Sequence, residues 1–170
     1  QHFIEGVLNL AAHHSELLFV FRSKSDSWLN DPRMQSTVER LAVLPNCLVS
    51  REYGQLNESY RLVASADLVI AKYTSLVDEC LAVGIPSIIH DYTPIAAGTS
   101  RPVVPYLPAR LFVQHDQELE ASVQWAMQSD GEDFRTWWEP HRRRVFGDLN
   151  DGHVRQRARQ AMQSMLDEMT

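Results

Sequence analysis

The chain has 170 residues, 44% hydrophobic and 22% charged, which is ordinary for a globular domain with a full core. The formal net charge of −6 argues against broad nucleic-acid binding. No apolar run reaches the ~20 residues of a membrane-spanning helix, no signal peptide is visible, and two cysteines are too few for a zinc site.

Helical and strand-like patterns alternate along the chain. Apolar residues at every third or fourth position predict helices, and short apolar runs between turn residues predict strands. In chain order we expect a helix over 2–13, a strand at Leu17–Phe21, a helix at Met34–Val43, a strand at Cys47–Ser50, a helix after Asn57, a strand at Leu68–Ala71, a helix ending at Gly84, strands at Ser87–Ile89 and Leu111–Val113, helices over 116–129 and Phe134–Phe146, and a closing helix within 147–170. The continuous apolar run Leu17–Phe21 should be buried on both faces.

This alternation predicts one α/β domain over residues 1–170, with a Rossmann-like, doubly wound parallel sheet and helices on both faces. In such sheets ligands bind beyond the carboxyl ends of the strands. The sequence has no initiator Met and opens within a predicted helix, so we expect a piece of a larger protein. Cys47 and Cys80 should be buried free thiols of a reducing compartment.

The most informative candidates lie where a strand ends and a helix begins. Thr74 and Ser75 stand at such a helix start, where free backbone N–H groups and the helix dipole favour a phosphate. Lys72 adds a positive charge just before it. The alternative interpretation is structural: the hydroxyls cap the helix, Ser75 and Asp78 form a capping box, and Lys72 is a solvated lysine.

Two further sets of residues extend this candidate site. Glu79 lies one helical turn beyond Ser75, where its carboxylate can accept hydrogen bonds from ribose hydroxyls. Otherwise it is a partly exposed helix acid. Arg22 and Lys24 follow the first strand and can reach a diphosphate, or they form a solvated basic patch.

His90 and Asp91 end another strand and are candidates for acid–base catalysis, although neighbouring residues in a strand point to opposite faces. The sequence contains no G-x-S-x-G, G-x-G-x-x-G or P-loop pattern, which disfavours α/β hydrolases, NAD enzymes and P-loop NTPases. No acidic pair has D-x-D spacing, so we expect neither a metal nor a cofactor.

The order of these residues resembles a known family. Ser65–Asp67, Tyr73–Ser75, Glu79 and Gly84-x-Pro86 are similar to the C-terminal, nucleotide-binding half of GT-B glycosyltransferases. The likeness is nearest to bacterial CDP-glycerol glycerophosphotransferases and related surface-polysaccharide transferases. That family has S-D-x-x-I-T-D-Y-S-S followed by an acidic residue. Its C-terminal end often reads D-G-x-A-x-x-R, to which Asp151–Arg157 is similar.

This resemblance implies that Thr74 and Ser75 hold the donor phosphate, that Glu79 holds the donor ribose, and that Arg22 is the family's basic residue after an early strand. The sequence departs from the family at Lys72, where the family has an acid. It also has Arg22–Ser25 in place of K-x-H-P, so that histidine is absent. Within this resemblance, we expect the donor to be a different CMP-, CDP- or UDP-linked species.

The resemblance further implies that the chain is the donor-binding domain of a transferase and is inactive alone. The enzyme would move a glycosyl or glycerophosphate group to a bacterial surface glycan. Expected partners are the nucleotide-activated donor, the missing N-terminal domain and a glycan or lipid-linked acceptor, but no nucleic acid. The expected location is the cytoplasm, including peripheral association with the inner face of the membrane. Two alternatives are a GT-B-fold sugar-nucleotide epimerase and a non-catalytic Rossmann-like module that binds phosphate or another protein.

Overall fold

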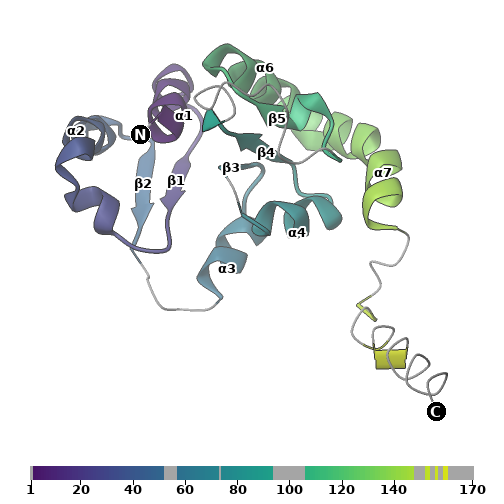
Figure 1. The fold of residues 1–170 in the computed structure, drawn as a ribbon. Helices are drawn as coiled ribbons and strands as arrows, with labels where there is room; N and C mark the ends of the chain where they lie inside the picture. The colour runs from purple at the N-terminus through teal and green to yellow at the C-terminus, as the bar shows by residue number, and fades with distance from the viewer. Residues whose placement is uncertain are drawn as a thin grey trace.

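The structure is a computed structural model that describes residues 2–51, 57–72, 74–93, 106–147, 152–153, 156 and 159–160. It is an α/β fold with parallel strands and a long C-terminal helix (Figure 1). Its helices and strands are α1 (His2–His13), β1 (Phe19–Arg22), α2 (Gln35–Val43), β2 (Cys47–Ser50), α3 (Glu58–Ala64), β3 (Val69–Ala71), α4 (Leu76–Ala82), β4 (Ser87–His90), β5 (Phe112–Val113), α6 (Asp116–Met127) and α7 (Glu132–Phe146).

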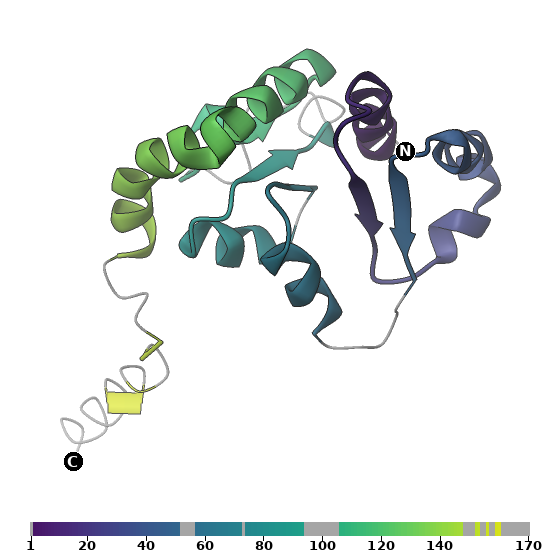
Figure 2. The ribbon, with the colours of Figure 1, turned by 180° about the vertical axis from the view of Figure 1, so that it is seen from behind.

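The strands form two parallel sheets rather than one. β1 pairs with β2, and β4 lies between β3 and β5 in a three-stranded sheet. Both views show β1 and β3 next to each other (Figures 1 and 2). Within the described residues, however, no hydrogen-bond ladder joins these two strands. The predicted α/β class and parallel strands are confirmed, whereas a continuous sheet is not present in this part of the chain.

Two buried clusters cover the two faces of the three-stranded sheet. Because side chains alternate along a strand, Ile88 of β4 faces α1 and α6, which we call the first face. Ile89 packs on the opposite, second face with residues of α4 and α7. All four residues of β4 are buried, as is typical of a central parallel strand.

The β1–β2 sheet is well covered on one side only. Phe19 and Phe21 pack against the first-face cluster. Val20 is 44% exposed and its register partner Leu48 is 53% exposed. The prediction that Leu17–Phe21 is buried on both faces is therefore wrong, because the side chains on the second face lie largely in solvent.

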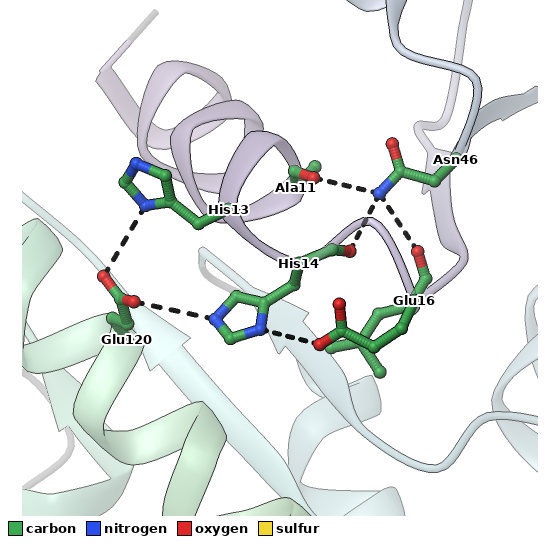
Figure 3. Close-up of polar contacts among 7 residues, drawn as sticks. Ala11, His13, His14, Glu16, Asn46 and Glu120 are labelled. Atoms are coloured by element: carbon green, nitrogen blue, oxygen red, sulfur yellow. Dashed lines mark hydrogen bonds and ion pairs between the residues drawn. The ribbon is translucent and has the colours of Figure 1, made fainter.

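Polar contacts hold the C-terminal end of α1 at the amino edge of the sheets (Figure 3). Asn46, directly before β2, donates from Nδ2 to the carbonyl oxygens of Ala11, His14 and Leu17 at 2.9, 3.0 and 3.1 Å. Glu120 of α6 lies 3.6 Å from Nε2 of His14. These contacts connect α1 to both β2 and α6, and they leave the first turn of α1 at the carboxyl edge.

Most element boundaries agree with the predictions, with small shifts. The helix predicted at Met34–Val43 begins at Gln35, because a short 3-10 turn over Pro32–Met34 precedes it. The helix predicted over 116–129 ends at Met127, where residues with positive φ follow.

The predicted closing helix within 147–170 lies largely outside the described residues. In the part of the chain that the structure describes, no helix has the length and hydrophobicity needed to cross a membrane. Both cysteines are free thiols, with Cys80 buried and Cys47 half-buried.

Candidate functional site

The carboxyl ends of the strands carry charges of opposite sign on the two sides of the fold. Because parallel strands all end at one edge, these groups share the edge at which α/β folds bind ligands. The cations that follow β1, β2 and β3 are Arg22, Lys24, Arg51 and Lys72. The acids that follow β4 and β5 are Asp91 and Asp116.

Thr74 and Ser75 lie at the start of α4, as predicted, but they act differently there. The Oγ1 of Thr74 accepts a hydrogen bond from the N–H of Leu76 at 3.3 Å, so Thr74 caps the helix. Ser75 has helical dihedral angles (φ −59°, ψ −20°) and its hydroxyl makes no capping bond. The carboxylate of Asp78 instead accepts a hydrogen bond from the hydroxyl of Tyr106 at 2.6 Å. The predicted Ser75–Asp78 capping box is therefore wrong, and Ser75 is exposed at the helix start.

The start of α4 offers a modest electrostatic attraction to an anion. The helix has only seven residues, and the N–H groups of Leu76 and Val77 already bond to Thr74. Charge from the helix dipole is concentrated in free N–H groups of the first turn. A phosphate at this position therefore depends more on the Ser75 hydroxyl and on Lys72 than on the dipole.

Lys72 and Asp91 are brought together at the ends of two neighbouring strands. The Nζ of Lys72 lies 4.0 Å from Oδ1 of Asp91, and the carboxylate is fully buried whereas the lysine is half exposed. The same Oδ1 accepts a hydrogen bond from the N–H of Thr93 at 2.9 Å. Within the described residues, Oδ2 of Asp91 has no hydrogen-bond partner. Burial of a carboxylate is unfavourable unless it is paired and hydrogen-bonded, so Lys72 has a structural role besides any role towards a ligand.

Glu79 is exposed on α4 and faces a tyrosine of the preceding helix. A hydrogen bond to Glu79 raises the pKa of Tyr60, which lies on α3 and is half exposed. Glu79 is thus held at the α3–α4 surface, four residues after Ser75, with one partner already present. A carboxylate has lone pairs for several donors, so this contact leaves capacity for ligand hydroxyls.

His90 and Asp91 do not form a pair. His90 is fully buried on the first face, where its ring packs against those of Phe3 and Tyr92 at centroid distances of 5.9 and 4.6 Å. Asp91 follows it in the strand and contacts Lys72 on the other side. Burial lowers the pKa of His90, while the nearby carboxylate of Asp116 opposes this change. The geometry excludes direct proton exchange between His90 and Asp91.

Sequence reasoning missed a second polar group around His90. The hydroxyl of Tyr92 donates a hydrogen bond to Oδ1 of Asp116, and that oxygen lies 3.9 Å from Nε2 of His90. Burial raises the pKa of Tyr92, so it remains a donor. A surface depression of about 480 Å³ opens over this group, with His2 and Glu5 of α1 on its other wall.

The signal for this group was Gly6 in the middle of a predicted helix. A Cβ on Gly6 would lie 2.6 Å from Cε1 of His90, 2.7 Å from Oδ1 of Asp116 and 3.0 Å from the Tyr92 hydroxyl. Only glycine lets α1 approach this closely, and an isolated glycine in a helical pattern often has a packing reason.

The predicted phosphate ligands Arg22 and Lys24 lie on the other sheet. The guanidinium of Arg22 donates to the carbonyl oxygen of Ser23, and Lys24 is exposed. No ladder joins β1 to β3 in the described residues. Backbone pairing therefore does not hold Arg22 and Lys24 at a fixed distance from the start of α4.

No group of three or more His, Cys, Asp or Glu side chains suited to a metal ion occurs in the described ranges. Comparison with known proteins found no relative, since no protein-family model, curated protein or solved structure matches the chain. Geometry and charge at the strand ends are therefore the observations that bear on function.

Proposed function

We propose that the chain binds the nucleotide part of an activated donor at the carboxyl edge of its strands, as the donor-binding domain of a GT-B transferase. The observation that carries this proposal is that Lys72, Ser75 and Glu79 are all exposed between the end of β3 and the first turn of α4. A cation and a hydroxyl suit a phosphate. A carboxylate one helical turn away suits the vicinal hydroxyls of a ribose.

The charge distribution along the edge supports an orientation for the donor. The cations after β1, β2 and β3 favour the diphosphate on that side. On the other side, Asp116, Tyr92 and His115 border the depression over β4 and β5. Carboxylate, phenol and imidazole groups are hydrogen-bond partners for hydroxyl groups, so the transferred glycosyl or glycerol moiety would extend towards them.

The same proposal extends to the whole fold and to the enzyme that would contain it. The two sheets would belong to one Rossmann-like, doubly wound sheet that forms half of a GT-B enzyme acting in the cytoplasm on a surface glycan. A second domain of the enzyme would supply the acceptor site and the catalytic base. Lys72 and a Thr74-capped helix would stabilise charge on the leaving nucleotide. The epimerase alternative loses support, because His90 and Asp91 face opposite sides of the sheet.

Nucleotide titration tests the proposal directly. The 170-residue chain is titrated with CMP, CDP, UDP and ADP while backbone amide shifts are followed by NMR. We expect the diphosphates to shift amides between residues 72 and 79 more strongly than CMP does. Absence of a shift in this segment with all four nucleotides would refute the donor-binding function.

Two substitutions assign the roles of individual side chains. Ser75→Ala and Glu79→Ala should each weaken diphosphate binding by about 1–3 kcal/mol, the range for loss of one partner in a polar contact. Ser15→Ala is the matched control, because Ser15 is an exposed serine just after the C-terminal end of α1. This variant should bind normally. If both site variants bind as the control does, Ser75 and Glu79 contribute only to the surface of α4.

One observation favours a second candidate, a non-catalytic phosphate-binding module. Glu79 interacts with Tyr60 of α3 and raises the pKa of that tyrosine, so it has a structural role without any ribose. In that case inorganic pyrophosphate would bind as tightly as CDP and would shift the same amides. Glu79→Ala would leave binding unchanged. A clear preference for the nucleotide over pyrophosphate would favour the donor-binding domain.

A further inference from the structure

In the part of the chain that the structure describes, no strand pairs with the edges of β1 and β3 that face each other. The N–H of Phe19 donates to the carbonyl oxygen of Asn46 beside β2, and the N–H of Val69 donates to that of Pro86 beside β4. In a parallel strand, successive residues direct their N–H and C=O groups to opposite sides. Val20 therefore directs its backbone groups away from β2, and Ile70 directs its groups away from β4. We call these two edges, at Val20 and Ile70, the seam.

The two sides of the seam belong to one packed unit. Phe19 and Phe21 of β1, and Leu68 and Ile70 at β3, pack against the same first-face cluster. That cluster includes Val7 and Leu10 of α1, so α1 belongs to the same packed unit as side chains from both sheets. The seam therefore lies within the fold, under a helix, where unsatisfied backbone groups are unfavourable.

The helical layer on the first face is wide enough to cover more than five strands. Figures 1 and 2 show α2, α1 and α6 side by side along this face, and α1 contacts both of the others. Three helices packed about 8–10 Å apart span about 24–30 Å. Five strands at about 4.8 Å span about 24 Å, whereas six span about 29 Å. The helical layer can therefore accommodate a sheet with one more strand.

We propose that the seam is the binding position of one further apolar β-strand, parallel to β1 and β3, from the segment of the same polypeptide that directly precedes α1. The direction of α1 supports this source. Its first turn lies at the carboxyl edge, where the ring of His2 is 5.8 Å from that of Tyr92. A parallel strand in the seam ends at this same edge, so a short connection suffices. The resulting β–α1–β1 unit has the same form as the observed β1–α2–β2 unit.

The strand order that results is β2-β1-inserted strand-β3-β4-β5. Numbered along the chain, this is 3-2-1-4-5-6, the order of dinucleotide-binding folds. The inserted strand would also bring the ends of β1 and β3, with Arg22 and Lys72, to a fixed separation. The inference is independent of which ligand binds at the carboxyl edge.

The test adds a strand-forming sequence before residue 1 and measures amide hydrogen exchange at the two edges of the seam. The sequence Val-Ile-Val-Val-Ile-Gly-Ser-Gly is placed before residue 1, and the matched control has Val-Pro-Val-Pro-Ile-Gly-Ser-Gly, which is apolar but cannot complete a ladder. Amide hydrogen exchange is measured by NMR at Val20 and Ile70. The amides of Phe19 and Val69, which are already bonded, serve as internal references.

In the 170-residue chain, we expect Val20 and Ile70 to exchange faster than the two reference amides. The apolar extension should slow exchange at both positions about tenfold or more, and the proline control should not. If the extended chain does not fold, the acetylated and amidated peptide Val-Ile-Val-Val-Ile, added in excess to the original chain, must slow the same two amides.

Two results would overturn the proposal. In the first, nuclear Overhauser contacts join β1 directly to β3 in the 170-residue chain, with Val20 and Ile70 already protected. The seam would then close by itself into a five-stranded sheet. In the second, the apolar and proline-containing extensions have the same effect on the two amides.

Discussion

The two sheets of this protein differ in how far their side chains are buried. In the three-stranded sheet, all four residues of β4 are buried, and clusters cover both faces. In the two-stranded sheet, Val20 and Leu48 point into solvent although β1 and β2 are parallel strands. Parallel strands normally occur with both faces covered. The difference identifies the β1–β2 sheet as the less covered part of the described fold.

The comparison also bears on function. Lys72 and Asp91 belong to the well-packed sheet, and their contact fixes the edge where β3 and β4 end. Arg22 and Lys24 belong to the other sheet, whose backbone should open at a lower free energy because it buries fewer apolar contacts. A ligand that needs both sets of residues would therefore stabilise the β1–β2 sheet more than the rest of the protein.

The largest expected effect contrasts the two cores. Trp138→Ala should lower the free energy of unfolding by about 3–5 kcal/mol, since a fully buried indole is removed. In the original chain Nε1 of Trp138 donates a hydrogen bond to the carbonyl oxygen of Leu81 at 2.7 Å, and the substitution removes this bond. Leu48→Ala, on the exposed side of β2, should change stability by less than about 0.5 kcal/mol. Urea unfolding measures both. Equal effects would mean that the β1–β2 sheet is covered in solution.

The next effect concerns the contacts that hold the end of α1 to the β1–β2 sheet. Asn46→Ala should cost about 1–3 kcal/mol, because its Nδ2 group serves three carbonyl oxygens near the end of α1. Exchange of amides in β1 and β2 should accelerate more than exchange in β4. Asn30→Ala, at an exposed asparagine, is the matched control. Uniform acceleration across all strands would contradict independent opening of the β1–β2 sheet.

A pH titration probes the well-packed sheet through His90. Burial holds the pKa of the folded-state imidazole below its ordinary value. As the pH falls below about 6.5, the unfolded chain takes up a proton that the folded chain does not, so stability decreases. The slope contributed by this residue is at most about 1.4 kcal/mol per pH unit.

The measurement compares the free energy of unfolding at pH 7 and pH 5 for the original chain and for His90→Phe, which keeps an aromatic ring beside Phe3 and Tyr92. The variant should lose less stability on acidification, because the remaining histidines are common to both proteins. An identical pH dependence would show that folded His90 titrates as it does in the unfolded chain.

The sequence predicted the elements whose periodicity is set locally. The strand at Cys47–Ser50 agrees residue for residue, and α1 and α7 agree closely, because apolar spacing and turn residues determine them. The burial of Leu17–Phe21 was predicted wrongly. An apolar run indicates a strand that can be covered on both faces, but whether a covering element is present depends on tertiary contacts.

The candidate site divides in the same way. The strand-to-helix position of Thr74 and Ser75 could be read from the sequence, since capping residues have local signatures. The Tyr92–Asp116 group could not, because it joins the end of β4 to the start of α6 across 24 residues. Only Gly6 indicated it beforehand, and a glycine alone does not say which side chains approach it.

The smallest expected effect lies in the connection between α6 and α7. Ser129 and Asp130 have φ of 51° and 53°, left-handed values that cost a non-glycine residue about 1 kcal/mol, and Gly131 follows with φ of 77°. Asp130→Gly should relieve this strain but adds freedom to the unfolded chain, so we expect a net gain of about 0.5 kcal/mol or less.

Gly131→Ala is the opposite test and should cost about 1 kcal/mol, since the new methyl meets Arg135 Nη1 at 3.4 Å in a left-handed conformation. Thermal unfolding of the two variants compares them directly. Because Phe134 and Trp138 anchor α7 in the second-face cluster, neither change should alter amide exchange in β1 and β2, and an effect there would show that the two sheets open together.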